Sequence, residues 1–348
     1  MQAIRVHPSP DGPHPYTPSN PAPSSSLHLD KVPLPKPSTP GEILLKIKAS
    51  TIIRDTLTWP ETYTHEYTTP GNDLSGVVID VFGDDPNSTF KPGDAVFGML
   101  PADQPGSWAE YAIVSETSIA HKPTILTWEE AAAAPLSGMT AYEALFLHAS
   151  VPVPGNEEAV RNWKREGRLD PDSSRTKLLL TGAAGAVGVY LVQLARLAGL
   201  HVTAATRSNE RNAEFLRELG VDDTIEYAAL HTPAHESIYD IVIDTVGGQP
   251  LVDAWACIKG KGSLVSVDSS SFNFVEEHAT RGIAREGVKA LFFIVQGVRE
   301  GLDALAHFAQ LGILRVFVLD TYPLEKVQEA YDRANGRLTG RGKIILRI

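Results

Sequence analysis

The stretch that decides the fold is "LLLTGAAGAVGVYLVQLARLAG", residues 178–199. It begins as an apolar strand and ends as an amphipathic helix, and the turn between them consists largely of glycine and alanine. Gly182, Gly185 and Gly188 are spaced three apart, which permits a tight turn, close approach of a ligand to the backbone and close helix–strand packing. Free amides at a helix start favour an anion. The stretch therefore predicts a site for the diphosphate of a dinucleotide, and the alternative is a tight turn without a ligand.

The segments after residue 177 alternate between apolar strands and helices. "LHVTAAT" (200–206) and "YDIVIDTVG" (239–247) are nearly continuous strands of this kind. Such runs are typical of parallel strands that are buried on both faces, because crossover helices cover the sheet. The pattern predicts an α/β protein with a Rossmann-type, doubly wound parallel sheet.

The first third of the chain has a different pattern. "GEILLKIKAS" (41–50) is the first strong alternating strand, and short strands separated by glycine turns follow to about residue 120. This β-rich part is predicted to form a partly open barrel. After the helices and strands of the middle part, the tail returns to mixed strands around a helix.

These patterns predict two domains. The substrate domain comprises residues 1–124 and a returning segment, 297–348, and the nucleotide domain comprises residues 125–296. Residues 150–176 are polar and turn-rich, which indicates a surface loop inserted into the nucleotide domain. A short helix is expected in this loop around "WKRE" (163–166).

Composition and charge exclude several classes of partner. The net charge of −11 and the absence of a basic run argue against nucleic acid and anionic membranes. The longest strongly apolar stretch, residues 290–295, is too short to span a bilayer. Cys257 is the one cysteine, which excludes an intramolecular disulfide and a cysteine-rich zinc site. We expect a soluble, cytoplasmic protein.

The end of the strand after the glycine turn indicates which dinucleotide binds. An NAD site usually has an acidic residue about 20 residues beyond the glycines. Here the chain has Thr206, Arg207, Ser208 and Arg211, with no carboxylate before Glu210. Guanidinium and hydroxyl groups suit the 2′-phosphate of NADP, so NADP is favoured over NAD. Alternatively, the two arginines are solvated residues at a helix start that Ser208 caps.

Several motifs together resemble one family, the medium-chain dehydrogenases/reductases, and within it the zinc-independent quinone oxidoreductase and enoyl reductase branch. The motifs are "PGNDLSGVV" (70–78), "GDAVFG" (93–98), "GSWAEYAIV" (106–114), "AAAAPLSGMTAYEAL" (131–145), "LLLTGAAGAVG" (178–188) and "GRGKIIL" (340–346). The resemblance covers nearly the whole chain. It implies a β-rich, GroES-like substrate domain around an NADP-binding Rossmann domain.

The residues at the expected metal positions predict that the protein binds no metal. Zinc-dependent relatives use a cysteine and a His–Glu pair, but this chain has Ile53 at the first position and Asn72–Asp73 at the second. Isoleucine and asparagine cannot build a tetrahedral zinc site. Ile53 also replaces an asparagine that relatives commonly carry, so any role of that residue in orienting substrate or nicotinamide is lost or taken over by a neighbour.

The resemblance also implies a set of cofactor-binding residues. Ser137 and Thr140 are expected beside the nicotinamide, unless they only break one helix and cap the next. Tyr227 is expected near the adenine ribose phosphate, unless it packs at a strand end. The full set is Ser137, Thr140, Gly182, Ala184, Gly185, Ala186, Val187, Gly188, Thr206, Arg207, Ser208, Arg211, Tyr227, Val246, Gly247, Phe292, Phe293, Val295 and Lys343.

Some of these residues have an equally simple structural interpretation. Phe292, Phe293 and Val295 either pass the nicotinamide or belong to the core. Lys343 either reaches a cofactor phosphate or is a surface lysine. Tyr63 is the candidate proton donor, with Tyr67 second, and a tyrosine that only packs in a loop is the alternative. Tyr63 and Thr140 are the residues predicted to be catalytic.

The sequence therefore predicts an NADPH-dependent, zinc-free reductase that delivers hydride to an activated C=C bond or to a quinone. Carbonyl reduction is a second possibility, and a non-catalytic NADPH-binding protein is a third. The apolar strand "VKALFFIV" (288–295) is expected at the edge of the nucleotide sheet, where it would need a cover or a partner. In relatives this edge often pairs with its twin, so a homodimer is expected.

Overall fold

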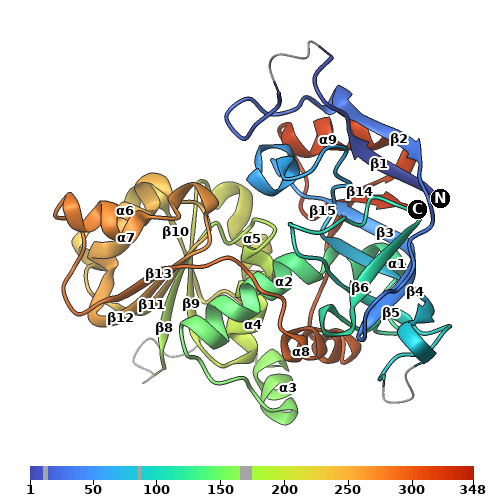
Figure 1. Cartoon of the computed structure of the whole chain (residues 1–348). Coiled ribbons are helices and arrows are strands. Elements are labelled where there is room, and N and C mark those ends of the chain that lie inside the picture. Colours follow the sequence, from blue (N-terminus) through green and yellow to red (C-terminus); the bar gives the residue numbers. More distant parts are fainter. Residues whose placement is uncertain (11–14, 85–87, 165–174) are drawn as a thin grey trace. The chain divides into compact units, whose positions relative to one another are not determined.

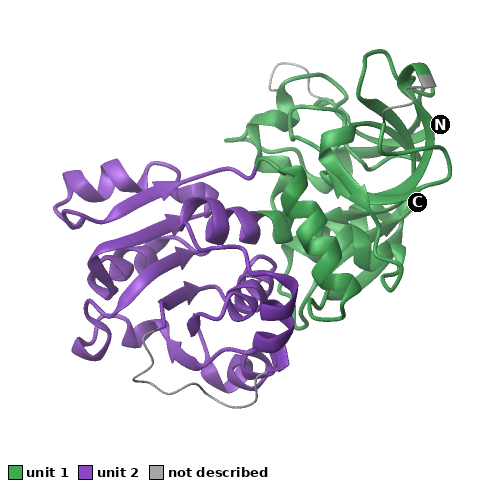
Figure 2. Ribbon diagram, turned by 90° about the horizontal axis from the view of Figure 1, so that it is seen from below, with its two compact units in different colours: residues 1–139, 296–348 green, residues 140–295 purple. Residues whose placement is uncertain are grey.

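The computed structural model describes residues 1–10, 15–84, 88–164 and 175–348. The chain forms two compact units, which Figure 2 distinguishes by colour. The first comprises Met1–Met139 and Gln296–Ile348, and the second comprises Thr140–Val295. The second unit thus begins later than residue 125, where the sequence placed the domain boundary, because helix α1 (Trp128–Ala133) packs on strands of the first unit.

The first unit contains a seven-stranded sheet with the order β14-β15-β3-β4-β5-β7, and β6 also pairs with β3. A separate pair, β1 and β2, is antiparallel. The strands of the first unit are β1 (Gln2–Val6), β2 (Leu27–Lys31), β3 (Glu42–Ile52), β4 (Asp73–Val81), β5 (Ala95–Met99), β6 (Tyr111–Ser115), β7 (Ile119–His121), β14 (Val318–Pro323) and β15 (Lys343–Arg347). Besides α1, its helices are α8 (Arg299–Gln310) and α9 (Val327–Asn335).

The second unit contains a six-stranded parallel sheet with the order β10-β9-β8-β11-β12-β13 (Figure 1). Its strands are β8 (Lys177–Thr181), β9 (His201–Thr206), β10 (Asp223–Glu226), β11 (Tyr239–Asp244), β12 (Ile258–Ser266) and β13 (Lys289–Phe292). Its helices are α3 (Asn156–Lys164), α4 (Gly188–Leu197), α5 (Asn209–Leu219), α6 (Gly248–Cys257) and α7 (Phe274–Thr280), and Glu143–His148 is π-helical.

The topology of the second unit confirms the predicted doubly wound sheet. The strand order reverses between β8 and β11, which makes that point the switch of the sheet. Helices α4 and α5 contact β8, β9 and β10, whereas α6 and α7 contact β11, β12 and β13, so both faces are covered (Figure 1). The apolar run Leu178–Leu180 is completely buried, as expected for a central parallel strand.

The inserted segment differs in detail from the prediction. Its helix is α3, Asn156–Lys164, which begins before the expected "WKRE". Ala159 is its buried residue, and Asn162 donates a hydrogen bond to the carbonyl of Leu197 at the end of α4 (2.8 Å). Tertiary contact with α4 therefore selects the helical residues. Residues 165–174 of the predicted loop lie outside the described residues.

Helix α2 (Pro135–Tyr142) connects the two units, since the first ends at Met139 and the second begins at Thr140. It starts directly after α1, where Pro135 interrupts the helical pattern. No helix within the described residues is long and apolar enough to cross a membrane.

Candidate functional site

The glycine turn follows β8 and leads into α4. Gly182 has a positive φ of 66°, and a Cβ there would lie 2.1 Å from Oγ1 of Thr245. A Cβ on Gly188 would lie 2.2 Å from the carbonyl oxygen of Gly182, so both positions require glycine. A Cβ on Gly185 would meet that carbonyl oxygen alone, at 3.1 Å, which leaves space above the turn. Together with the start of α4, this geometry fits a bound diphosphate.

A pocket of about 620 Å³ lies in the second unit, beyond the carboxyl ends of β9 and β11. Ligands of doubly wound sheets bind at this kind of edge. Four residues predicted from the sequence line it, namely Arg207, Tyr227, Val246 and Gly247. The structure adds His231, Gln249 and Asp253, which the sequence analysis missed because no motif marks them.

Tyr227 joins this pocket to the glycine turn. Its hydroxyl accepts a hydrogen bond from the amide of Gly182 (3.1 Å). Burial raises the pKa of Tyr227, so the phenol is neutral at physiological pH and keeps its proton. A neutral hydroxyl that already accepts one hydrogen bond can still donate one to an oxygen of a ligand in the pocket.

Arg207 is exposed at the pocket wall and forms no hydrogen bond or ion pair with another described residue. The other residues of its predicted cluster differ in environment. Thr206 is buried, and its Oγ1 accepts a hydrogen bond from Nδ2 of Asn212 (2.6 Å). Ser208 is the N-cap residue of α5 but makes no side-chain capping bond. Of the four residues of this cluster, Arg207 is the one that lines the pocket.

The remaining predicted cofactor residues lie elsewhere. Ser137 and Thr140 are buried on α2, three residues apart on one side of that helix. Phe292 is half-buried and packs against the core around Trp255, while the ring of Phe293 lies 4.1 Å from that of His148. Val295 is half-buried at the end of the second unit. Their contacts with a cofactor stay predictions.

Tyr63 ends a short 3-10 helix, Pro60–Tyr63, in the first unit. Its hydroxyl donates to the carbonyl oxygen of Leu57 and accepts from the amide of Ala22 (2.9 Å). Burial raises the pKa of Tyr63. Both hydrogen-bonding functions of the hydroxyl thus hold backbone segments together. A role as proton donor stays a prediction, and it requires one of these bonds to open.

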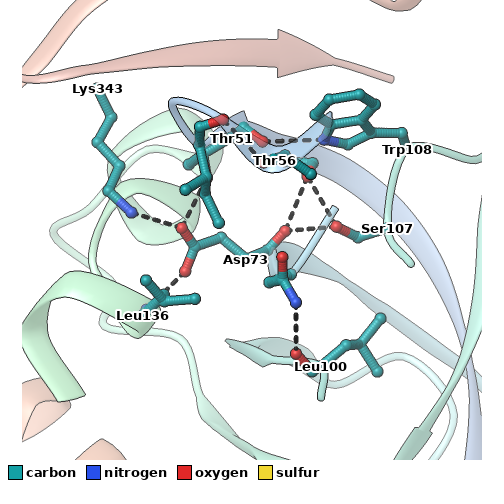
Figure 3. Close-up of polar contacts among 11 residues, drawn as sticks. Thr51, Thr56, Asp73, Leu100, Ser107, Trp108, Leu136 and Lys343 are labelled. Atoms are coloured by element: carbon teal, nitrogen blue, oxygen red, sulfur yellow. Dashed lines mark hydrogen bonds and ion pairs between the residues drawn. The ribbon is translucent and has the colours of Figure 1, made fainter. Parts of the chain in front are cut away.

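A buried polar network surrounds Asp73, the first residue of β4 (Figure 3). Asp73 is completely buried. Its Oδ2 lies 2.6 Å from Nζ of Lys343 and accepts a hydrogen bond from Oγ1 of Thr51 (2.6 Å). Its Oδ1 accepts one from the amide of Leu136 (2.6 Å), at the start of α2. Lys343 is 8% exposed and is therefore not the surface lysine considered as one alternative.

The residues at the expected metal positions do not fit zinc. Nδ2 of Asn72 donates to the carbonyl oxygen of Leu100 (3.1 Å), and Asp73 is engaged as described above. Burial raises the pKa of Cys257 to about 12, and its thiol donates to the carbonyl oxygen of Leu230. Among the residues that the structure describes, no group of three or more His, Cys, Asp or Glu side chains could hold a metal ion.

Comparison with known proteins assigns the family. Residues 39–124 match the "Alcohol dehydrogenase GroES-like domain" family, and residues 219–346 match the "Zinc-binding dehydrogenase" family. A probable zinc-binding oxidoreductase, mitochondrial, from Arthroderma benhamiae is 33% identical over 334 residues, which cover 94% of each chain. The chloroplastic quinone-oxidoreductase QR1 of Triphysaria versicolor is 28% identical and covers 91% of this chain and 93% of its own.

A solved structure agrees with this assignment at the level of the fold. The quinone oxidoreductase from Coxiella burnetii superimposes with a TM-score of 0.77 at 24% identity, over 100% of this chain and 99% of that one. The chain belongs to the medium-chain dehydrogenase/reductase superfamily, in its quinone oxidoreductase branch. It is therefore an oxidoreductase with a GroES-like domain and a Rossmann domain, as the motifs predicted.

Proposed function

We propose that the protein is an NADPH-dependent, zinc-free reductase of activated C=C bonds or quinones. The observation that carries this proposal is the pocket at the carboxyl edge of the parallel sheet, which Arg207 lines together with Tyr227, the residue that binds the glycine turn. A nicotinamide cofactor supplies a hydride when it is bound. Relatives named as NAD(P)H oxidoreductases and quinone oxidoreductases support the same class of reaction.

Each part of the pocket has a proposed task. The start of α4 is proposed to bind the diphosphate, because the first amides of a helix favour an anion, while the amides of Gly182 and Gly185 donate to Tyr227 and to the carbonyl oxygen of Gly182 and so hold the turn in shape. Arg207 binds the 2′-phosphate through bidentate hydrogen bonds, and the neutral hydroxyl of Tyr227 donates to the same end of the cofactor. Val246 and Gly247 form the wall of the groove. Ser137 and Thr140 of α2 are proposed to contact the nicotinamide side.

The proposed substrates follow from the chemistry of a site without a metal. Hydride addition to the β-carbon of an enone leaves an enolate, whose charge is delocalised and needs only a hydrogen-bond donor. Reduction of an isolated ketone leaves an alkoxide, for which relatives with zinc have a Lewis acid. We therefore place the activated alkene or quinone ahead of the isolated carbonyl. The proton is proposed to come from solvent or from Tyr63.

Steady-state kinetics of wild type, Arg207→Ala and Arg217→Ala test the proposal. Arg217 lies in the last turn of α5 and does not line the pocket, so it controls for the loss of one positive charge. Arg207→Ala is expected to raise the KM for NADPH about tenfold or more, equivalent to about 1.4 kcal/mol, and to leave that for NADH nearly unchanged. Arg217→Ala should change neither. An equal loss for both cofactors would remove the phosphate assignment.

A substrate panel and a metal analysis complete this test. NADPH oxidation is measured with 2-cyclohexenone, an enoyl thioester and 1,4-benzoquinone. No oxidation with any of them would support a non-catalytic NADPH-binding protein instead. Elemental analysis of the purified protein is expected to give far less than one zinc per chain, and chelators should leave the rate intact. Stoichiometric zinc would overturn the zinc-free proposal.

A further inference from the structure

Asp244 is a buried carboxylate that the family motifs do not mark as part of the site. It is the last residue of β11 and is completely buried. Its Oδ1 accepts hydrogen bonds from Oγ1 of Thr181 (2.6 Å) and from the amide of Val246 (3.3 Å). Its Oδ2 accepts from the amide of Gly247 (2.9 Å) and from Oγ of Ser266 (2.9 Å). The four groups come from the ends of β8 and β12, the two strands that pair with β11, and from the loop after β11.

Burial of this side chain is unfavourable for the free energy of folding unless other contacts compensate for it. Burial of a carboxylate costs several kcal/mol unless hydrogen bonds replace the lost water. Burial raises the pKa of Asp244, and the hydrogen bonds from Thr181, Gly247 and Ser266 oppose that effect. The amides of Val246 and Gly247 can only donate, whereas the hydroxyls of Thr181 and Ser266 can donate or accept. Each carboxyl oxygen of Asp244 therefore accepts a hydrogen bond from a backbone amide of the loop after β11.

The network extends from Asp244 to the glycine turn. Oγ1 of Thr181 also accepts a hydrogen bond from the amide of Thr245 (3.1 Å), and Oγ1 of Thr245 donates to the carbonyl oxygen of Thr181 (3.0 Å). This same Thr245 hydroxyl oxygen is the atom that a Cβ on Gly182 would strike. The turn after β8 and the turn after β11 are thus packed against each other and joined by hydrogen bonds.

The turn after β11 forms part of the pocket wall. Val246, Gly247 and Gly248 all line the pocket. Gly247 has a positive φ of 68°, and a Cβ there would lie 2.2 Å from Oδ2 of Asp268, so this position requires glycine. Asp244 fixes the turn after β11 by accepting hydrogen bonds from two of its backbone amides.

We propose that Asp244 is a positioning residue for dinucleotide binding. Its carboxylate clamps the turns after β8 and β11 in the geometry that the diphosphate and the adenosine end of the cofactor need. Preorganisation of this kind lowers the cost of ordering the site when the ligand binds. The inference rests on the proposed function, since it requires a dinucleotide in this pocket. It concerns parts of the cofactor that NADH and NADPH share, whereas Arg207 concerns the 2′-phosphate.

The test compares Asp244→Asn, Thr181→Val and Ser266→Ala with the control Thr203→Val. Thr203 is a buried threonine on β9, from which β8 separates β11, and none of the hydrogen bonds of Asp244 given above involves it. Dissociation constants for NADPH and NADH are measured by quenching of protein fluorescence, together with kcat, KM and the urea midpoint. Asp244→Asn and Thr181→Val are expected to weaken both cofactors by the same factor, about tenfold or more. The kcat at saturating cofactor should stay within about twofold of wild type, and Ser266→Ala should have a smaller effect in the same direction.

The cofactor affinities of the variants show whether Asp244 positions the turns. Unchanged affinity for both cofactors in a folded Thr181→Val protein would overturn the inference, as would an equal loss in Thr203→Val, which would indicate general destabilisation. If Asp244→Asn does not fold, Thr181→Val and Ser266→Ala carry the test. A wild-type protein that prefers neither cofactor would contradict the role of Arg207 but not that of Asp244. A wild-type protein that binds neither would overturn both.

Discussion

Replacing Lys343 with methionine would leave the carboxylate of Asp73 buried without its cationic partner. The hydroxyl of Thr51 and the amide of Leu136 would remain as donors, but they are neutral. Breaking a buried ion pair by removing one partner typically costs about 3–5 kcal/mol, because the other charge stays uncompensated. Since Asp73 is completely buried and Lys343 is 8% exposed, we expect a loss in this range.

The matched control is Lys326→Met. Lys326 also forms an ion pair, with Glu329 (3.1 Å), but the two side chains are 58% and 59% exposed. Exposed pairs of this kind contribute at most about 1 kcal/mol. Comparison of the two variants therefore separates the effect of burial from the loss of one lysine.

Urea unfolding gives the magnitude of the effect. With a slope of about 2 kcal/mol per molar urea, a loss of 3 kcal/mol lowers the midpoint by about 1.5 M. Hydrogen exchange of peptides from β4, β15 and the start of α2 should increase in Lys343→Met, because the network joins these elements. The variant Asp73→Asn/Lys343→Met should recover part of the loss, since it leaves no buried charge. A midpoint shift no larger than that of Lys326→Met would refute this reasoning.

Three further predictions concern the proton donor, the assembly and the pH response. Tyr63→Phe should destabilise the protein by about 1–2 kcal/mol, because two backbone groups lose their partner, and should slow turnover less than tenfold; a hundredfold slower, equally stable variant would instead support proton donation. Light scattering at micromolar concentration should give a dimer mass, since β13 is the edge of its sheet and Ile294 beside it is 67% exposed; a monomer mass would contradict this. Burial lowers the pKa of His278, and its Nδ1 accepts a hydrogen bond from Nε1 of Trp255 (2.8 Å). As the pH falls, the histidine of the unfolded chain therefore takes up a proton before that of the folded protein does. The urea midpoint should then fall as the pH drops below about 6.5. His278→Gln should reduce that fall, and an unchanged pH profile would disprove it.

The sequence predicted the fold of the second unit because its signals are local. An apolar strand, a glycine turn and a helix occur within residues 178–199, and this pattern repeats with the strands that follow. Local signals also allowed four pocket residues to be predicted, because the strands of a parallel sheet carry their carboxyl ends to one edge. These residues are Arg207, Tyr227, Val246 and Gly247. The helix of the inserted segment begins earlier in the chain than predicted, because its packing on α4 has no signature in the local sequence.

The polar networks could not be predicted, because their members are distant in sequence. Asp73 and Lys343 are 270 residues apart, and Thr181 and Asp244 are 63 apart. One signal was present, since Asp244 ends the buried run "YDIVID", where an unpaired carboxylate would be costly. That signal indicates that a partner must exist, but it does not identify the partner. The hydrogen bond between Tyr63 and Ala22 belongs to the same class, because the two residues are 41 apart in sequence.

Isotopic labelling follows the proposed transfer of hydride from NADPH to the double bond of an activated alkene. NADPH labelled with deuterium at the transferable C4 position is incubated with 2-cyclohexenone, and the product is analysed by mass spectrometry and NMR. We expect a saturated ketone with deuterium at the β-carbon and a solvent-derived hydrogen at the α-carbon. An allylic alcohol with deuterium at the carbinol carbon would contradict reduction of the double bond and establish carbonyl reduction in its place.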